Sequence, residues 1–98
     1  MVVGVLRLDL LLEGSQSLKE KRSRVRKVLA KIRATYPVSA AEVGSHDLWQ
    51  RTLLGLCMVS SDEALIHSLF QRLEDDMTCS GLAEVVASDI EILHYGDE

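Results

Sequence analysis

Hydrophobic and polar residues first alternate with a period of two along the chain. In residues 2–12, the even positions from Leu6 to Leu12 are leucine, whereas the odd positions include Arg7 and Asp9. A strand that buries one face has this pattern, because successive side chains point to opposite faces of a sheet. The segment therefore predicts a strand whose even-numbered side faces the core.

The next segment changes to helical spacing. A helix is expected from about Leu18 to Thr35, because its apolar residues recur at intervals of three and four. Ser17 and Glu20 have the spacing of a capping box, in which the two side chains reciprocally satisfy free amide donors. The residue before Pro37 is disfavoured in a helix, so the helix should end there. Its expected core face consists of Leu18, Val25, Val28, Leu29 and Ile32.

A second helix is expected from the cap-like spacing of Ser60 and Glu63 to about Cys79. Ser80 and Gly81 follow it, and glycine is common just after a helix. The residues on its core face are predicted to be Ile66, Leu69, Phe70, Leu73 and Met77. Cys57, in the strand before this helix, is interpreted as a small core residue.

Three more segments are predicted to be strands, at residues 38–43, 48–60 and 82–95, and the first two form a hairpin. The order βαββαβ predicts an α+β, ferredoxin-like fold in a single domain of residues 1–98. It places two helices on one face of a four-stranded antiparallel sheet. Solvent or a second subunit must cover the other face, which would carry Val3, Val5, Arg7, Asp9, Asp89 and Glu91.

The amino-acid composition indicates the class of protein. Hydrophobic residues make up 47% and charged residues 27% of the chain, as in soluble globular proteins. No apolar run approaches the roughly 20 residues of a membrane-spanning helix, and the first residues do not have the charge pattern of a secretory signal. Two cysteines, Cys57 and Cys79, fit reduced thiols. We expect a cytoplasmic protein that does not associate with membranes.

Charge is distributed very unevenly. The 15 residues from Lys19 to Arg33 contain eight basic residues and one acid, a charge of +7, whereas the other 83 residues carry −11. Basic residues cover nearly all of the predicted helix's solvent side, although like charges three or four positions apart repel. A polyanion such as nucleic acid would bind such a surface. The alternative is that acidic groups elsewhere in the domain, or in a dimer mate, pair with these cations.

Several other functions are disfavoured. Sheet-face stacking of RNA bases requires aromatic residues on the two central strands, and residues 2–12 and 50–60 contain none. An acylphosphatase-type site needs an asparagine, which the chain lacks, and an arginine after the first strand, where Glu13-Gly14-Ser15-Gln16 stands. The histidines do not have metal-ligand spacing, and the neighbours His46 and Asp47 have no nucleophile placed near them by spacing. We expect no enzyme activity, cofactor or metal.

Two short motifs resemble a known family. Ser17-Leu18-Lys19-Glu20-Lys21-Arg22 and Asp47-Leu48-Trp49-Gln50-Arg51, with the flanking segments, are similar to the YlxP-like family of small bacterial proteins of unknown function. The resemblance implies a ferredoxin-like fold and no established activity. Genes of the family often lie beside those of translation and ribosome-assembly factors, which hints at RNA or ribosome work.

The leading hypothesis is a non-enzymatic accessory factor that binds RNA or a ribosomal subunit through its first helix. Trp49 and Arg51 are candidates for an adjoining contact. The alternative is a homodimeric protein-interaction module that uses the open sheet face, with the basic helix meeting an acidic partner. The predicted phosphate-contacting residues are Lys19, Lys21, Arg22, Arg24, Arg26, Lys27, Lys31 and Arg33.

Overall fold

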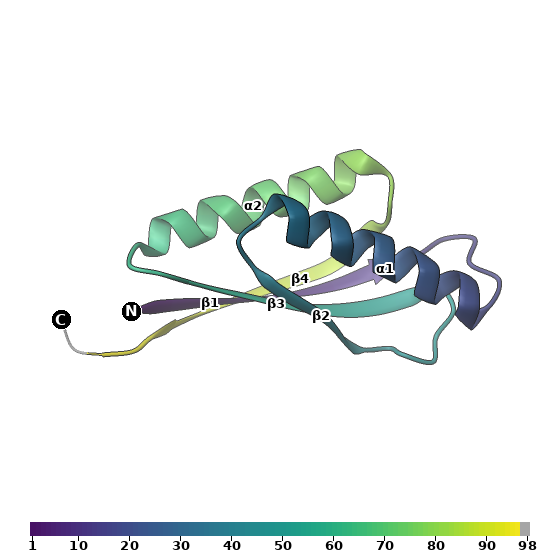
Figure 1. Ribbon diagram of the computed structural model, residues 1–98, viewed down its shortest axis with the longest axis horizontal. Helices are drawn as coiled ribbons and strands as arrows, with labels where there is room; N and C mark the ends of the chain where they lie inside the picture. Colours follow the sequence, from purple (N-terminus) through teal and green to yellow (C-terminus); the bar gives the residue numbers. More distant parts are fainter. Residues whose placement is uncertain (97–98) are drawn as a thin grey trace.

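The computed structural model describes residues 1–96, in which four strands and two helices follow the predicted order (Figure 1). The elements are β1 (Val2–Leu11), α1 (Leu18–Thr35), β2 (Ser39–Gly44), β3 (Arg51–Ser60), α2 (Glu63–Ser80) and β4 (Glu84–His94).

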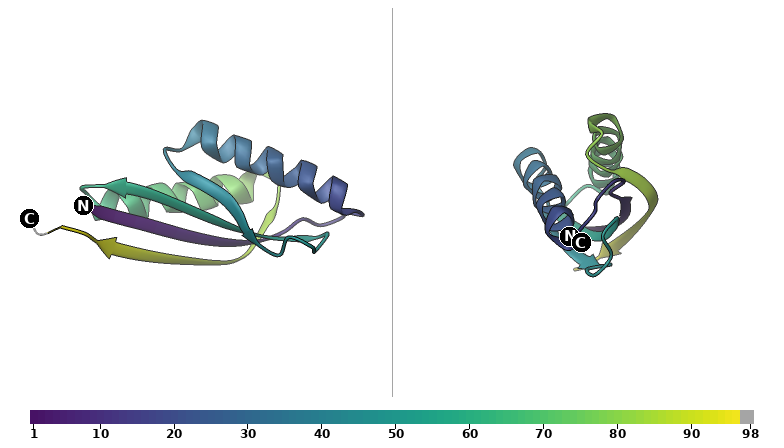
Figure 2. Two further views of the ribbon diagram at one scale, coloured as in Figure 1. Left: turned by 60° about the horizontal axis from the view of Figure 1, so that its bottom comes forward. Right: turned by 90° about the vertical axis from the view of Figure 1, so that its right-hand side faces the viewer.

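The strands form one antiparallel sheet in the order β2-β3-β1-β4. Both helices pack on the same face of the sheet, and the other face is bare (Figure 2). The predicted α+β, ferredoxin-like fold is therefore confirmed. In the two central strands Val5 lies opposite Cys57, and on its other side it lies opposite Glu91 of β4.

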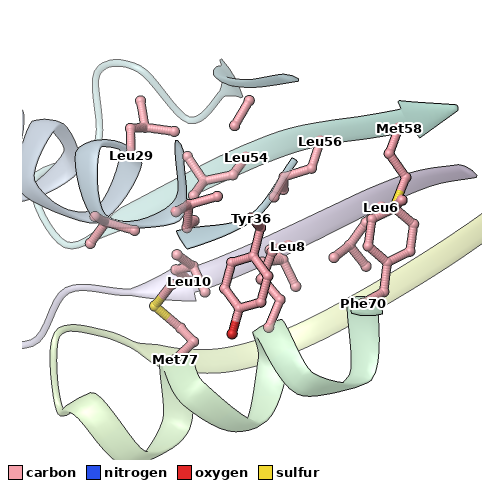
Figure 3. Close-up of a cluster of buried hydrophobic side chains, with 14 of the residues drawn as sticks. Leu6, Leu8, Leu10, Leu29, Tyr36, Leu54, Leu56, Met58, Phe70 and Met77 are labelled. Carbon is pink, nitrogen blue, oxygen red and sulfur yellow. The ribbon is translucent and has the colours of Figure 1, made fainter. Parts of the chain in front are cut away.

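The core lies between the sheet and the two helices (Figure 3). Leu6, Leu8 and Leu10 of β1 are completely buried, which confirms that the even-numbered side of this strand faces the helices. Phe70 of α2 packs over the same strand. Gly4 makes this close approach possible, because a Cβ atom at this position would clash with Ile66 and crowd Phe70.

Both helices begin at a side-chain cap. The Ser17 hydroxyl accepts a hydrogen bond from the Glu20 amide, as predicted, at 3.1 Å. The Glu20 carboxylate, however, accepts from the Gln16 amide and not from Ser17, so the box is not reciprocal. At α2 the cap is Asp62, which accepts from the Ala64 amide, and the prediction of a box starting at Ser60 was wrong.

The end of α2 has the geometry expected from its sequence. Gly81 follows the helix with φ of 71°, the left-handed conformation that glycine adopts without a steric penalty.

Two sequence interpretations in the hairpin region were wrong. The third strand starts at Arg51 and not at residue 48, so Trp49 lies in the connection and is 53% exposed. Cys57 is exposed and is not a core residue. Its neighbours Leu56 and Met58 point toward the helices, and alternation along β3 therefore turns Cys57 to the open face.

Candidate nucleic-acid interface

The basic side chains of α1 lie in two rows along the helix. Residues three or four positions apart share a face, so Lys19, Arg22 and Arg26 follow one another, with Arg33 further along. Lys27 and Lys31 form the second row, which begins at Arg24. Six of the eight predicted residues are exposed: Lys19, Arg22, Arg26, Lys27, Lys31 and Arg33.

Most of these cations are not paired with acidic groups of their own domain. Within residues 1–96, the carboxylates that lie within 4.0 Å of a basic side chain pair with Lys21, Arg51 or a histidine. The exposed lysines and arginines of α1 are in none of these pairs. Intramolecular pairing, the alternative explanation of the basic surface, is therefore not found in the described part of the chain.

Two arginines at the margins of this surface hold neighbouring segments, the loop after β1 and the strand β2. Arg24 is half-buried, and its guanidinium donates to the Glu13 carbonyl at 2.7 Å and to the Ser15 hydroxyl at 2.9 Å. Arg33 donates to the Ala40 carbonyl at 2.5 Å. Their hydrogen-bonding capacity is partly used, so both are weaker phosphate ligands than the remaining cations.

Lys21 is not part of the exposed surface, and the prediction that it contacts phosphate was wrong. Its exposure is 0%. The ammonium group lies 2.7 Å from Oε2 of Glu42 and donates to the carbonyl oxygens of Ser45 and His46 at 2.9 and 3.1 Å. These three partners satisfy all three ammonium protons, so the buried charge is compensated.

The ion pair with Lys21 changes the pKa of the Glu42 carboxyl. Partial burial acts to raise the pKa of this carboxyl, but hydrogen bonds from Lys21 and Thr52 and the charge of Lys21 outweigh that effect. The pKa of Glu42 is therefore lowered. The Thr52 hydroxyl donates to the same carboxylate oxygen at 2.6 Å. The pair thus joins α1 to both β2 and β3 and holds the hairpin against the start of the basic helix.

The two candidates for an adjoining contact lie in different surroundings. Trp49 is exposed in the connection between β2 and β3. Arg51 instead pairs with Asp9 at 2.7 Å on the open sheet face, away from the helices, and Asp9 raises the pKa of its guanidinium. The prediction that Arg51 adjoins the basic helix was wrong, because its side chain emerges on the opposite side of the sheet.

The described residues offer little for other kinds of chemistry. Residues 1–96 contain no group of three metal-ligating side chains. His46 and Asp47 are both exposed. Neither helix of the described region is long and apolar enough to cross a membrane.

The sequence comparisons identify a family without an assigned role. Residues 3–90 match a family model described as "Protein of unknown function (DUF503)". Over 71 residues the chain is 32% identical to "Uncharacterized protein YlxP" of Bacillus subtilis (strain 168), which covers 72% of this chain and 77% of that protein. A structure named "De novo designed protein Foldit4" aligns over 99% of this chain and 98% of that chain, with 14% identity and a TM-score of 0.46.

Proposed function

The chain belongs to the family described as Protein of unknown function (DUF503), and on this premise we propose that it is a non-enzymatic RNA-binding protein whose α1 contacts the phosphate backbone. Its membership confirms the resemblance to YlxP-like proteins. The observation that carries the proposal is the surface of exposed, unpaired cations on α1. We further propose that the RNA is ribosomal and that the protein acts in the cytoplasm.

Electrostatics favours a polyanion as the ligand. The five exposed cations of α1 other than Arg33 repel one another and are stabilised when phosphates neutralise them and release bound counterions. These five are Lys19, Arg22, Arg26, Lys27 and Lys31. The remainder of the domain is acidic, which directs an approaching polyanion to α1.

The mode of recognition follows from what the surface presents. Lysine and arginine side chains on a helix contact phosphate oxygens, which position a protein on nucleic acid without reading its bases. The open sheet face presents Asp9, Asp89 and Glu91 in place of stacking aromatic residues. We therefore propose recognition of RNA by backbone and shape, along the outer side of α1.

A charge-reversal variant with a matched control tests the role of the helix. Lys27→Glu combined with Lys31→Glu should weaken binding to a structured ribosomal RNA fragment at low salt, measured by fluorescence anisotropy. The control, Arg72→Glu combined with Gln71→Glu and Thr78→Glu, changes the net charge equally at exposed sites on α2. A larger loss of RNA affinity in the α1 variant than in the control supports the proposal. Equal affinities of the two variants would remove α1 from the interface.

Sedimentation with ribosomal subunits tests the ribosomal part of the proposal. The wild-type protein should pellet with purified subunits at low salt and be released as salt is raised, because phosphate contacts are salt-dependent. Absence of the protein from the pellet at low salt would contradict a ribosomal ligand. Retention of the helix variant at wild-type levels would contradict the assignment to α1.

A further inference from the structure

Neither helix covers the open face of the sheet (Figure 2). Both helices pack on the opposite face, and Figure 2 shows the strands bare on the side away from them. We infer that this face is the interface of a symmetric homodimer, in which a second copy of the chain packs sheet against sheet. This inference does not depend on RNA binding.

One half of the face is apolar. Val3 and Val5 of β1 lie opposite Val59 and Cys57 of β3, and all four side chains point away from the helices. Val59 is 61% exposed, more than any other large hydrophobic residue of the described chain. On the neighbouring strand Val43 is 54% exposed. A contiguous apolar surface of this kind is typical of a protein–protein interface.

The other half of the face carries charges of both signs. Arg51 pairs with Asp9, and Arg7 lies opposite Asp89 in the strand register. Glu91 of β4 adds a third acid next to Val5. A polyanion would meet these carboxylates at close range. A second copy presents the same two arginines and three carboxylates, so a two-fold axis lets acids of one face meet the arginines of the other.

The shape of the open face also allows a second copy to pack on it. A hollow of about 280 Å³ lies between β1, β3 and β2, lined among others by Val5, Ala41, Val43, Gly55 and Cys57. Gly55 and Val43 form one wall of this hollow, and the Val43 side chain packs against Gly55, where a Cβ atom would lie 3.0 Å from it. A protruding valine of one copy can thus enter the hollow of the other, as in the packing of two sheets.

The size of the face is sufficient for a stable dimer. The central strands have ten residues each. At about 3.3 Å per residue and about 4.8 Å between strands, the four-stranded face measures roughly 600 Å² in projection. Specific interfaces bury about 800 Å² per partner. The accessible area of the open face exceeds its projected area, because its side chains protrude to different heights. The open face therefore matches a small standard interface.

Sedimentation equilibrium of the wild-type protein and two aspartate variants tests the inference. The wild type should be a dimer at micromolar concentration. Val59→Asp places a charge in the apolar half and should give a monomer with an unchanged circular-dichroism spectrum. The matched control Leu65→Asp alters a 50% exposed hydrophobic residue on α2 and should remain a dimer. Val43→Asp repeats the test on β2 if Val59→Asp does not fold.

Three results of that experiment would overturn the inference. A wild-type protein that stays monomeric would show that solvent covers the face. A folded aspartate variant on the open face that stays dimeric would place the interface elsewhere. A trimer or larger assembly would contradict the two-fold arrangement.

The two cysteines provide an independent measurement within the native fold. Both are exposed in the single chain, but only Cys57 lies on the open face. Dimerisation should therefore protect Cys57 from a maleimide while Cys79 on α2 stays reactive. At a protein concentration one hundred times the dissociation constant of the dimer, mass action leaves roughly 7% of chains monomeric. Cys57 of the wild type should therefore react roughly fifteenfold more slowly than Cys57 of the Val59→Asp variant. Equal rates for Cys57 in the two proteins would contradict the inference.

Discussion

Lys21 has a structural role that differs from the role of its neighbours on α1. Its ammonium group is buried against Glu42 and two carbonyl oxygens of the hairpin connection. A buried charge is tolerated only when its partners compensate the lost hydration. Lys21 therefore fixes the position of the hairpin relative to the basic helix and does not contact a ligand.

Replacing Lys21 with methionine tests this role. Lys21→Met keeps the side-chain length but leaves Glu42 and both carbonyl oxygens without their donor. Removing one member of a buried ion pair costs about 3 to 5 kcal/mol of unfolding free energy. Glu42 is 18% exposed, so the lower end of this range is expected. Chemical denaturation measures the loss.

Lys27→Met is the matched control for this substitution, because Lys27 is an exposed lysine on the same helix. Its unfolding free energy should change by less than about 0.5 kcal/mol. Equal effects of the two substitutions would show that the contacts of Lys21 contribute little to stability.

The lowered pKa of Glu42 predicts a specific pH dependence. In the folded state the pKa of the Glu42 carboxyl lies below its usual value of 4.5, because hydrogen bonds from Lys21 and Thr52 outweigh the effect of burial. The stability that Glu42 contributes is therefore present above pH 4.5 and is lost as the pH falls through the folded pKa. The difference in unfolding free energy between wild type and Glu42→Gln should be largest at neutral pH and shrink below pH 4.5. A difference that stays constant down to pH 3 would contradict this role.

The sequence predicts the burial of Lys21 only in part. Lys21 stands three positions after Leu18 and four before Val25, so helical spacing alone places it on the core face. A lysine at such a position usually extends its ammonium to solvent. The carboxylate that retains it comes from β2, 21 residues later, and single-sequence patterns do not show which distant residue will pair.

At the scale of elements, the sequence predicted where the helices and strands are but not where each side chain of β3 points. The bounds of α1 and the inward side of β1 were correct, because both periodicities are long and regular. In the third strand, Leu53, Leu54 and Leu56 obscure the alternation, and the predicted strand began three residues too early. The positions of Trp49 and Cys57 were therefore misjudged.

The helix α1 should show a conflict between stability and function. Lys27 lies one turn from Arg24 and Lys31, so the three like charges repel. Lys27→Glu replaces this repulsion with favourable pairs and should raise the unfolding free energy by about 0.5 kcal/mol, as measured by thermal or chemical denaturation. The same substitution should weaken RNA binding. A variant that loses both stability and affinity would point instead to a structural role for Lys27.

At the scale of the whole molecule, the two proposed surfaces lie on opposite sides. The helices cover one face of the sheet, and the open face lies on the other (Figure 2). A dimer formed through the open faces would therefore have four layers, with one basic helix on each outer side. RNA binding and dimerisation would not compete, and each dimer would offer two separate phosphate-binding surfaces.

The salt dependence of RNA affinity tests the central claim most directly. For phosphate contacts, the logarithm of the association constant falls linearly with the logarithm of salt concentration, with a slope of about −0.7 to −0.9 per contact. Replacing Lys27 and Lys31 with alanine should make the slope shallower by roughly 1.5 units. Replacing Arg72, an exposed arginine on α2, with alanine should leave it unchanged. A slope near zero for the wild type, or an equal slope in all three proteins, would contradict binding of the phosphate backbone by α1.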